Sequence, residues 1–398
     1  VLRSHQLERA VAGPVYNARR HSEGMNVKTA LILGALAGQV DAVRTLQARG
    51  VSAHVCARDA DGPGVQAADE FHITDITDIT AVTDLARRVR ADIVYSVGSD
   101  IAMPTVAAVS EALGLPGFHS PEVTHLLRRK QAMRDLMNST GISRVEYEVI
   151  TSEDEANTWD RFPCVVKPVD AQGQRGISVV QHADEMRPAI REALAHAISR
   201  TAIIEDYLSG REISAHLIVD QGEMIFYLPS DRHVWDGPMV GVPRAHSLPL
   251  EPATEAYAEP LRQMLVELIH HLGVSNGPLY AQAICTPNGP RIVEIASRLD
   301  GCHLWRLLKH STGIDILDAV FGRLLGEPWP DLSVHTGVAP ATLEFILDDP
   351  ATVVTQDYVD RALHRDAVFS EVQVPLGTTP RRTNDVVARL GYQIRPGM

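Results

Sequence analysis

A lysine closes one apolar segment of the chain, and a glycine-rich stretch follows it. Residues 164–168 read Cys-Val-Val-Lys-Pro, and residues 170–176 read Asp-Ala-Gln-Gly-Gln-Arg-Gly. An ammonium group is costly to bury unless an anion meets it, and the backbone N–H groups of a glycine-rich loop can surround phosphate oxygens. Lys167 and this loop therefore fit a phosphate-binding site. They fit equally well a lysine at a sheet edge whose ammonium reaches solvent before a hairpin loop.

A second apolar segment ends in a carboxylate. Residues 203–208 read Ile-Ile-Glu-Asp-Tyr-Leu, and Glu212 opens the strand expected after the next turn. A linker of this kind can present backbone carbonyl and N–H groups to the edge of an adenine ring, and a carboxylate a few residues later can bind ribose hydroxyls. An ordinary strand–turn–strand with exposed acidic side chains explains the same residues. Taken alone, it is the simpler interpretation.

A third region pairs polar residues across a predicted hairpin. Segments 279–286 and 291–296 read as strands around Pro-Asn-Gly, which is a turn-forming sequence. Gln282 lies in the first strand, Glu294 in the second, and Arg298 just beyond it. Oxygen ligands on adjacent strands suit magnesium held between protein and polyphosphate, and the arginine suits a phosphate or a carboxylate. A hairpin with one buried glutamate–arginine ion pair is the alternative.

The predicted secondary structure that must position these residues begins with strands that alternate with helices. Segments 29–33, 52–57 and 92–97 read as buried strands, and a helix over 41–49 separates the first two. Strands that alternate with helices imply a parallel sheet with crossover helices. The first 120 or so residues therefore predict an α/β domain.

Further along the chain, strands joined by short turns replace that alternation, as in an α+β arrangement with antiparallel sheets. The sequence predicts an amphipathic helix over 124–141, with Lys130 in its first half, and a small mixed subdomain in about the last sixty residues. The other expected elements are strands at 201–205, 212–219 and 223–228 and helices at 184–199 and 254–272.

The composition argues against several functional classes. The chain has 398 residues and a formal net charge of −13, and it has no Lys/Arg-rich stripe, so nucleic acid is not expected as a partner. No apolar run reaches membrane-spanning length, so a membrane is not expected either. The four cysteines lie far apart without a Cys-x-x-Cys pair, which favours a reduced, cytoplasmic protein. Residues 1–24 are polar and arginine-rich, which predicts an N-terminal extension rather than a secretory signal.

The three stretches, in this order, resemble the ATP-grasp superfamily over roughly residues 27–330. The resemblance implies a parallel-sheet α/β domain that precedes a two-part ATP-grasp fold with antiparallel sheets. The implied divisions are a pre-ATP-grasp domain at 25–120, an ATP-grasp domain at 121–330 with a lid at about 143–204 and a larger part at about 205–330, and a C-terminal subdomain at 331–398.

The resemblance also implies a role for each matching residue. The implied roles are phosphate contacts for Lys130, Lys167 and the 171–176 loop with Gln172, Gly173 and Gly176; adenine contacts for Glu205, Tyr207 and Leu208; a ribose contact for Glu212; magnesium binding for Glu294 and Gln282; and catalysis for Arg298, Lys167 and Glu294.

Two residues depart from the usual superfamily pattern. Gln282 stands where a metal-binding acid is usual, and Ala296 stands where an asparagine is usual. The motif Glu-Ile-Ala-x-Arg-Leu-x-Gly at 294–301 and the ending Arg-Leu-Gly-Tyr at 389–392 resemble the branch of bacterial L-amino acid ligases. That branch implies ATP with Mg²⁺, or Mn²⁺ in its place, small carboxylate and amine substrates, ADP as a product, and compatibility with a homodimer.

Two other functions stay open at this stage. A carboxylase of the same superfamily that activates bicarbonate shares all of the ATP residues. An ATP-binding regulatory protein without catalysis is the other, and Gln282 and Ala296 are the reason to keep it. Among the seventeen histidines, His233, His246 and His303 are candidates to reach a substrate, although most histidines in proteins lie on the surface or in the core.

Overall fold

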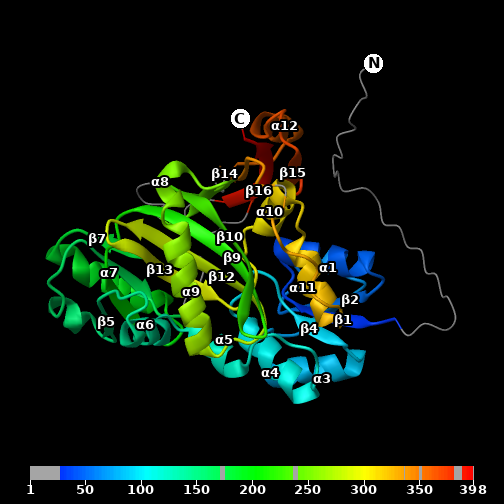
Figure 1. Ribbon diagram of the computed structural model, residues 1–398, viewed down its shortest axis with the longest axis horizontal. Coiled ribbons are helices and arrows are strands. Elements are labelled where there is room, and N and C mark those ends of the chain that lie inside the picture. Colours follow the sequence, from blue (N-terminus) through cyan, green and yellow to red (C-terminus); the bar gives the residue numbers. More distant parts are fainter. Residues whose placement is uncertain are drawn as a thin grey trace.

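The computed structural model describes residues 27–170, 175–235, 241–335, 337–348, 352–380 and 388–397. Within these ranges the chain forms a parallel sheet near the N-terminus, a small antiparallel sheet, and a large antiparallel sheet between them (Figure 1). The predicted extension at 1–24 and the predicted loop residues Gln172 and Gly173 lie outside the described residues. None of the described helices combines the length and apolar character needed to span a bilayer.

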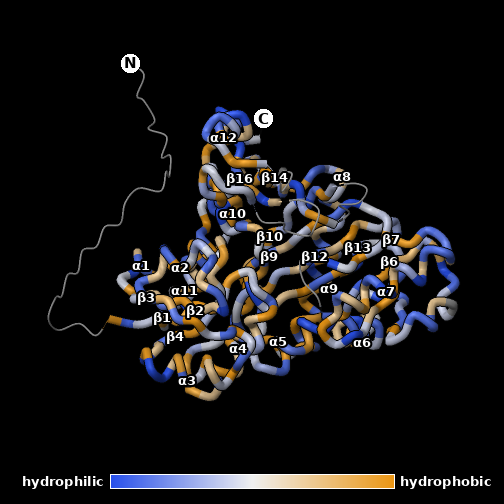
Figure 2. The backbone as a smooth tube through the Cα atoms, turned by 180° about the vertical axis from the view of Figure 1, so that it is seen from behind, coloured by the Kyte–Doolittle hydropathy of each residue, from blue (hydrophilic) through white to orange (hydrophobic). Residues whose placement is uncertain are grey.

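The N-terminal sheet is parallel throughout, with strand order β3-β2-β1-β4. Residues 30–33 of its first strand are fully buried, as expected for a parallel strand that is covered on both faces, and Figure 2 shows apolar residues concentrated along this sheet. Its strands are β1 (Thr29–Leu33), β2 (Ser52–Ala57), β3 (Glu70–Ile73) and β4 (Ile93–Tyr95), and its helices are α1 (Ala37–Ala48), α2 (Pro63–Ala67), α3 (Ile79–Val89) and α4 (Met103–Leu113).

The helix predicted over 124–141 is in fact two helices, α5 (Pro121–Arg128) and α6 (Lys130–Thr140). Arg129 between them is extended, with φ −95° and ψ 106°, and so cannot continue the helical hydrogen bonding. Lys130 is therefore the first residue of α6 and not a residue within a longer helix. Its backbone N–H donates to the carbonyl of Val169 at 3.3 Å, next to the end of β6.

The small sheet has strand order β5-β8-β6-β7 and is antiparallel. It has a core of its own, in which the apolar face of one helix covers the strands. Its elements are β5 (Tyr147–Ile150), η1 (Glu153–Asn157), β6 (Cys164–Pro168), β7 (Ser178–Val180), η2 (Ala183–Glu185), α7 (Met186–His196) and β8 (Ala202–Asp206).

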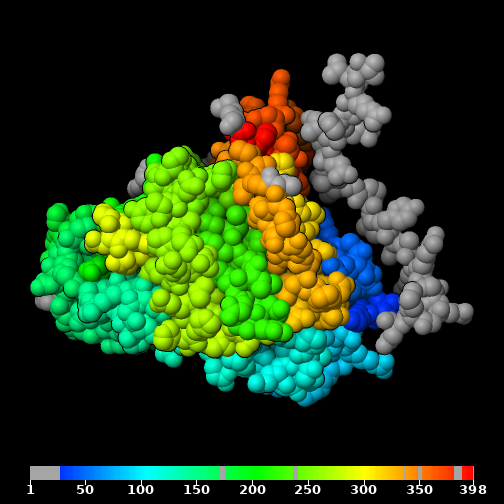
Figure 3. Space-filling model, viewed as in Figure 1, coloured from blue at the N-terminus to red at the C-terminus, as the bar shows by residue number. Residues whose placement is uncertain are grey.

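The large sheet has strand order β13-β12-β9-β10-β11-β14-β16-β15, with antiparallel neighbours. Helix α9 lies across one face of it and forms a broad part of the surface in Figure 3. The strands are β9 (Arg211–Asp220), β10 (Glu223–Val234), β11 (Pro243–Leu248), β12 (Gly277–Thr286), β13 (Gly289–Ala296), β14 (Ala341–Asp348), β15 (Phe369–Val372) and β16 (Ala388–Pro396).

Several predicted elements have different ends in the structure. Helix α1 begins at Ala37 rather than at residue 41, and the strand predicted at 223–228 continues to Val234. The helix predicted at 254–272 is divided into α8 (Pro252–Glu255) and α9 (Ala258–Leu272). These differences arise where packing extends or interrupts an element beyond its local sequence pattern.

The C-terminal strands do not form a sheet of their own, because β14 pairs with β11 and continues the large sheet. Residues of β14 and β16 share one buried core with the N-terminal sheet and with several helices, among them α1, α3 and α4. The remaining helices are α10 (Leu304–Thr312), α11 (Ile316–Leu324) and α12 (Gln356–Ala362). Strands from the N-terminal and the C-terminal parts of the described chain therefore pack in one core.

Candidate active site

Lys167 lies in a buried cluster with a carboxylate and an arginine. Its ammonium is 2.6 Å from Glu205 Oε2, and Arg134 donates through Nε to Glu205 Oε1 at 2.8 Å and through Nη2 to Oε2 at 3.2 Å. Strands β6 and β8 are neighbours and carry the lysine and the glutamate, while α6 carries the arginine. All three side chains are buried, so Lys167 does not reach solvent at a sheet edge.

This cluster carries one more positive than negative charge. Burial by itself raises the pKa of Glu205, but Arg134 and Lys167 outweigh it and lower that pKa to about 2. Burial lowers the pKa of Lys167, and Arg134 and Lys130 lower it further, against the attraction of Glu205. Two buried cations around one carboxylate leave an excess of positive charge, which an anion at this place would offset.

Glu212 on β9 is held by two donors. Arg232 on the neighbouring strand β10 forms an ion pair with it, and Gln282 on β12 donates through Nε2 to Glu212 Oε2 at 2.8 Å. The nitrogen of the Gln282 amide is therefore engaged, and its oxygen is the atom suited to an ion. The sequence indicated neither this contact nor the part taken by Arg232.

Glu294 lies opposite Gln282 in the β12–β13 pairing, where an irregularity between Gln282 and Ala283 shifts the register by one residue. It is half-buried. Among the described residues, no side chain or backbone N–H donates a hydrogen bond to its carboxylate. A half-buried carboxylate without a donor is suited to a cation that arrives with a ligand.

Arg298 pairs with an acid that the sequence did not single out. Its Nε donates to Asp100 Oδ1 at 2.7 Å and its Nη2 to Oδ2 at 2.5 Å. The buried glutamate–arginine pair considered for the hairpin is therefore not the ion pair that forms. Asp100 follows β4 at the carboxyl end of a parallel strand, which is where ligand sites of such sheets occur, and this position was the available signal.

A close backbone approach brings these two regions together. A Cβ atom at Gly98 would lie 2.7 Å from Gly301 Cα, and the φ of Gly98 is +68°. Both facts require glycine at this position. The loop after β4 thus packs on the segment that follows β13, and it delivers Asp100 to Arg298.

The other residues that the sequence predicts to bind the nucleotide lie around the small sheet. Tyr207 and Leu208 occupy the irregular link between β8 and β9, where the Tyr207 backbone N–H donates to Pro163 O at 3.3 Å. Gly176 has a φ of +69°, and a Cβ there would be 2.9 Å from His196 Cβ, so a larger residue would be strained. Lys130 is half-buried at the start of α6.

The three histidine candidates differ in their surroundings. His303 contacts Asp41 Oδ2 through Nδ1 at 3.1 Å and stacks on Tyr392, so it is part of the packing between domains. His233 Nε2 lies 2.8 Å from Ser247 Oγ. His246 is fully buried, neither ring nitrogen has a hydrogen-bond partner among the described residues, and burial lowers its pKa to about 3.

The cluster around Glu205, the hairpin and Arg298 fall within a segment that matches a known family. Residues 128–302 match the model of the phosphoribosylglycinamide synthetase ATP-grasp (A) domain. The chain is 24% identical over 216 residues to dapdiamide A synthase of Enterobacter agglomerans, which covers 51% of this chain and 50% of that protein. It is 26% identical over 292 residues to a phosphoribosylamine–glycine ligase of Methanococcus maripaludis, which covers 65% of this chain and 64% of that protein. The chain thus spans about half to just under two thirds of the length of these relatives.

Solved structures share the fold over nearly the whole chain. The L-amino acid ligase of Bacillus licheniformis has a TM-score of 0.75 and 17% identity, with 94% of both chains covered. The phosphoribosylglycinamide synthetase of Anaerococcus prevotii has a TM-score of 0.71 and 18% identity, with 94% of this chain and 95% of that chain covered. A biotin carboxylase of Campylobacter jejuni has a TM-score of 0.72 and 17% identity, with 94% and 89% covered. These likenesses concern the fold.

Proposed function

Since this chain belongs to the ATP-grasp superfamily, we propose that it is an ATP-dependent carboxylate–amine ligase. In the proposed reaction a substrate carboxylate oxygen attacks the γ-phosphorus of ATP, and ADP leaves with the bond between the β- and γ-phosphates broken. A neutral amine then attacks the acyl phosphate carbon, an amide forms, and phosphate leaves. The dapdiamide synthase and L-amino acid ligase among the similar proteins support amino-acid-like substrates.

The observation that carries this proposal is the division of charge between two sides of the site. The Arg134–Lys167–Glu205 cluster has a net positive charge, and Glu294 on the hairpin is a carboxylate without a donor among the described residues. A polyphosphate with a bound cation complements both sides of the site. Its negatively charged oxygens would face the Arg134–Lys167–Glu205 cluster, and its cation would face Glu294. Neither a purely structural ion pair nor an apolar ligand accounts for both sides.

The residues present fit ATP and magnesium. Glu294 and the amide oxygen of Gln282 would hold the ion, and Glu212 would meet the ribose, while the link at 207–208 offers backbone groups to the adenine. When bound, magnesium offsets the negative charge of the phosphates. Lys167 and Lys130 would orient the phosphates, and Arg298, positioned by Asp100, would stabilise the charge that develops on the transferred group.

The substrate side of the site is proposed to include His246. Its two ring nitrogens are buried and unpartnered among the described residues, and a buried polar group without a partner costs about 1–3 kcal/mol. A polar group of a bound substrate would remove that cost. We also propose a reducing, cytoplasmic setting, because the cysteines at 56, 164, 285 and 302 are all unpaired.

The test is incubation of the full chain with ATP, Mg²⁺ and pooled amino acids. We expect ADP rather than AMP, and a product whose mass equals two amino acids less water. The Glu294→Gln variant is the matched control, because it keeps the shape of the side chain and removes its charge. Formation of AMP would contradict the acyl phosphate route.

The same assay separates the two alternatives. Turnover that requires bicarbonate and no organic carboxylate would support the carboxylase. ATP binding without turnover on any acid and amine would support the regulatory protein. A condensed product in the absence of bicarbonate excludes both.

A further inference from the structure

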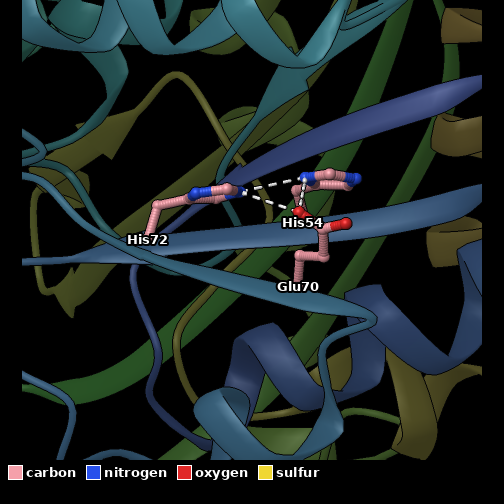
Figure 4. Close-up of side chains that lie close together, drawn as sticks. All are labelled: His54, Glu70 and His72. Atoms are coloured by element: carbon pink, nitrogen blue, oxygen red, sulfur yellow. Dashed lines mark hydrogen bonds and ion pairs between the residues drawn. The ribbon is translucent and has the colours of Figure 1, made fainter.

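Two histidines and a glutamate gather at the edge of the N-terminal parallel sheet, and none of them belongs to the candidate active site described above. His54 lies on β2, and Glu70 and His72 lie on β3, which is the outer strand of this sheet. Residue 54 pairs with residue 70 in the register, and residues 70 and 72 share one face of their strand. The three side chains therefore point toward one another (Figure 4).

The spacing of their polar atoms is close to that of a metal site. His54 Nδ1 lies 3.0 Å from His72 Nε2, and Glu70 Oε2 lies 3.8 Å from the first nitrogen and 4.0 Å from the second. Ligand bonds of about 2.0–2.1 Å in a tetrahedral zinc site place ligand atoms about 3.3 Å apart. The three separations would have to change by about 0.3 to 0.7 Å to reach that spacing, which is within the range of small side-chain rotations.

The protonation of the cluster also favours a metal. Two imidazole nitrogens 3.0 Å apart must share a single proton, so at least one ring is neutral. A neutral imidazole is the form that binds metal, and the shared proton must leave the two facing nitrogens when the ion enters.

The cluster has an accessible side. The Glu70 side chain is 65% exposed, whereas His54 is buried. An ion can therefore enter past the carboxylate and reach both imidazoles. Cys56 lies next to His72 in the register, and its side chain is fully buried in the apolar core rather than at the accessible side of the cluster.

We propose that His54, Glu70 and His72 bind one zinc ion, or a similar divalent transition-metal ion, between β2 and β3. Two imidazoles and one carboxylate suit zinc and not magnesium, which prefers oxygen ligands. The fourth position is open to water. The ion links the outer strand to its only neighbour among the described strands, and it is independent of the proposed ATP-linked magnesium site, with which it shares no residue.

The test uses the full chain without an affinity tag, stripped of metal by a chelator. Co²⁺ is titrated in the presence of excess Mg²⁺, which occupies oxygen-rich sites, and Zn²⁺ is then added to displace the Co²⁺. We expect one equivalent to bind with the visible absorption of four-coordinate cobalt. We also expect Zn²⁺ to raise the midpoint of thermal unfolding, because the ion binds the folded chain.

Glu70→Ala and His72→Ala are the informative variants. Each should weaken Zn²⁺ binding by about tenfold or more, in line with the sensitivity of metal sites to their supporting groups, and should abolish the rise of the unfolding midpoint. Since Glu70 is exposed, its variant is expected to fold even if the His72 variant does not. The matched control is the double variant His270→Ala/His271→Ala, which removes two exposed histidines of α9 and should bind as the unchanged chain does.

Three results would overturn the proposal. The first is an absence of Co²⁺ and Zn²⁺ binding by the unchanged chain. The second is unchanged affinity in a folded Glu70→Ala variant. The third is an equal loss of affinity in the His270→Ala/His271→Ala control.

Discussion

Two glutamates, Glu205 and Glu294, lie on neighbouring sheets of the candidate active site and have opposite surroundings. Glu205 is buried and accepts bonds from both Arg134 and Lys167. Glu294 is half-buried and, among the described residues, has no hydrogen-bond donor, although Arg298 lies near enough to interact with its charge. The first carboxylate is satisfied within the fold, and the second is left for a ligand.

The difference gives a way to separate structural charges from functional ones. A buried charge that has its partners contributes to the folded state, and removing one partner leaves the other uncompensated. A charge without partners contributes little to folding, so it can be removed at small cost to stability. Glu212 and Lys167 fall between these cases, because each has partners within the fold and a proposed contact with ATP.

The largest effect is expected for Arg134→Met. This change removes both of the bonds from Arg134 to Glu205 and leaves a buried carboxylate with Lys167 alone. We expect the free energy of unfolding to fall by about 3–5 kcal/mol, measured by denaturant titration. If the free energy of unfolding fell by less than about 1 kcal/mol, Glu205 would, like Glu294, be a carboxylate whose surroundings contribute little to the stability of the fold.

Unfolding at acid pH tests whether Glu205 is ionised within its cluster in the folded chain. The pKa of Glu205 falls from 4.5 to about 2 on folding, so the unfolded chain takes up the proton first as the pH drops. The stabilisation is fully present above pH 4.5 and is lost toward pH 2. The difference in unfolding free energy between the unchanged chain and Glu205→Gln should therefore shrink across this window. A difference that stays constant would contradict the ionised cluster.

Glu294→Gln should lower activity and leave stability unchanged. We expect kcat to fall about 100- to 1000-fold, comparable to the loss of one pre-organised electrostatic contact, with the unfolding free energy unchanged within about 0.5 kcal/mol. Turnover and denaturant titration are measured on the same preparation. Full activity combined with lost stability would mean that Glu294 is a structural charge.

Lys167→Ala should lower both quantities. Loss of a phosphate contact should cost about 2–4 kcal/mol at the transition state, and loss of the bond to Glu205 should cost about 1–3 kcal/mol of unfolding free energy. The control is Lys309→Ala, an exposed lysine of α10 paired with Asp315, which should change neither quantity. Near-normal kinetics for Lys167→Ala would remove this lysine from the site.

The smallest effect on activity is expected for Glu212→Ala. A ribose contact is made equally in the ground and transition states, so KM for ATP should rise about tenfold with a smaller change in kcat. Arg232 and Gln282 also lose their acceptor, so stability should fall as well. A fall in kcat with an unchanged KM for ATP would place Glu212 away from the nucleotide.

The sequence by itself determined the local pairings and the order of the motifs. The apolar run at 29–33 is a buried strand, and the turn around residues 287–289 joins the two strands that carry Gln282 and Glu294. The order of the lysine, linker and hairpin stretches was enough to indicate an ATP-grasp domain, and residues 128–302 match a model of such a domain. These features depend on residues near one another in the chain, where side-chain alternation and turn length leave few arrangements.

Only the tertiary structure decided which charges meet. Arg298 finds Asp100 across 198 positions, and Arg134 finds Glu205 across 71. The break at Arg129 and the pairing of β14 with β11 likewise were not predicted from the local sequence pattern. The same holds for the histidine–glutamate cluster on β2 and β3, since a register between strands is set by packing of the whole sheet. Charges and backbone groups take partners where the packed elements bring them together, and that placement depends on the complete core rather than on neighbouring residues.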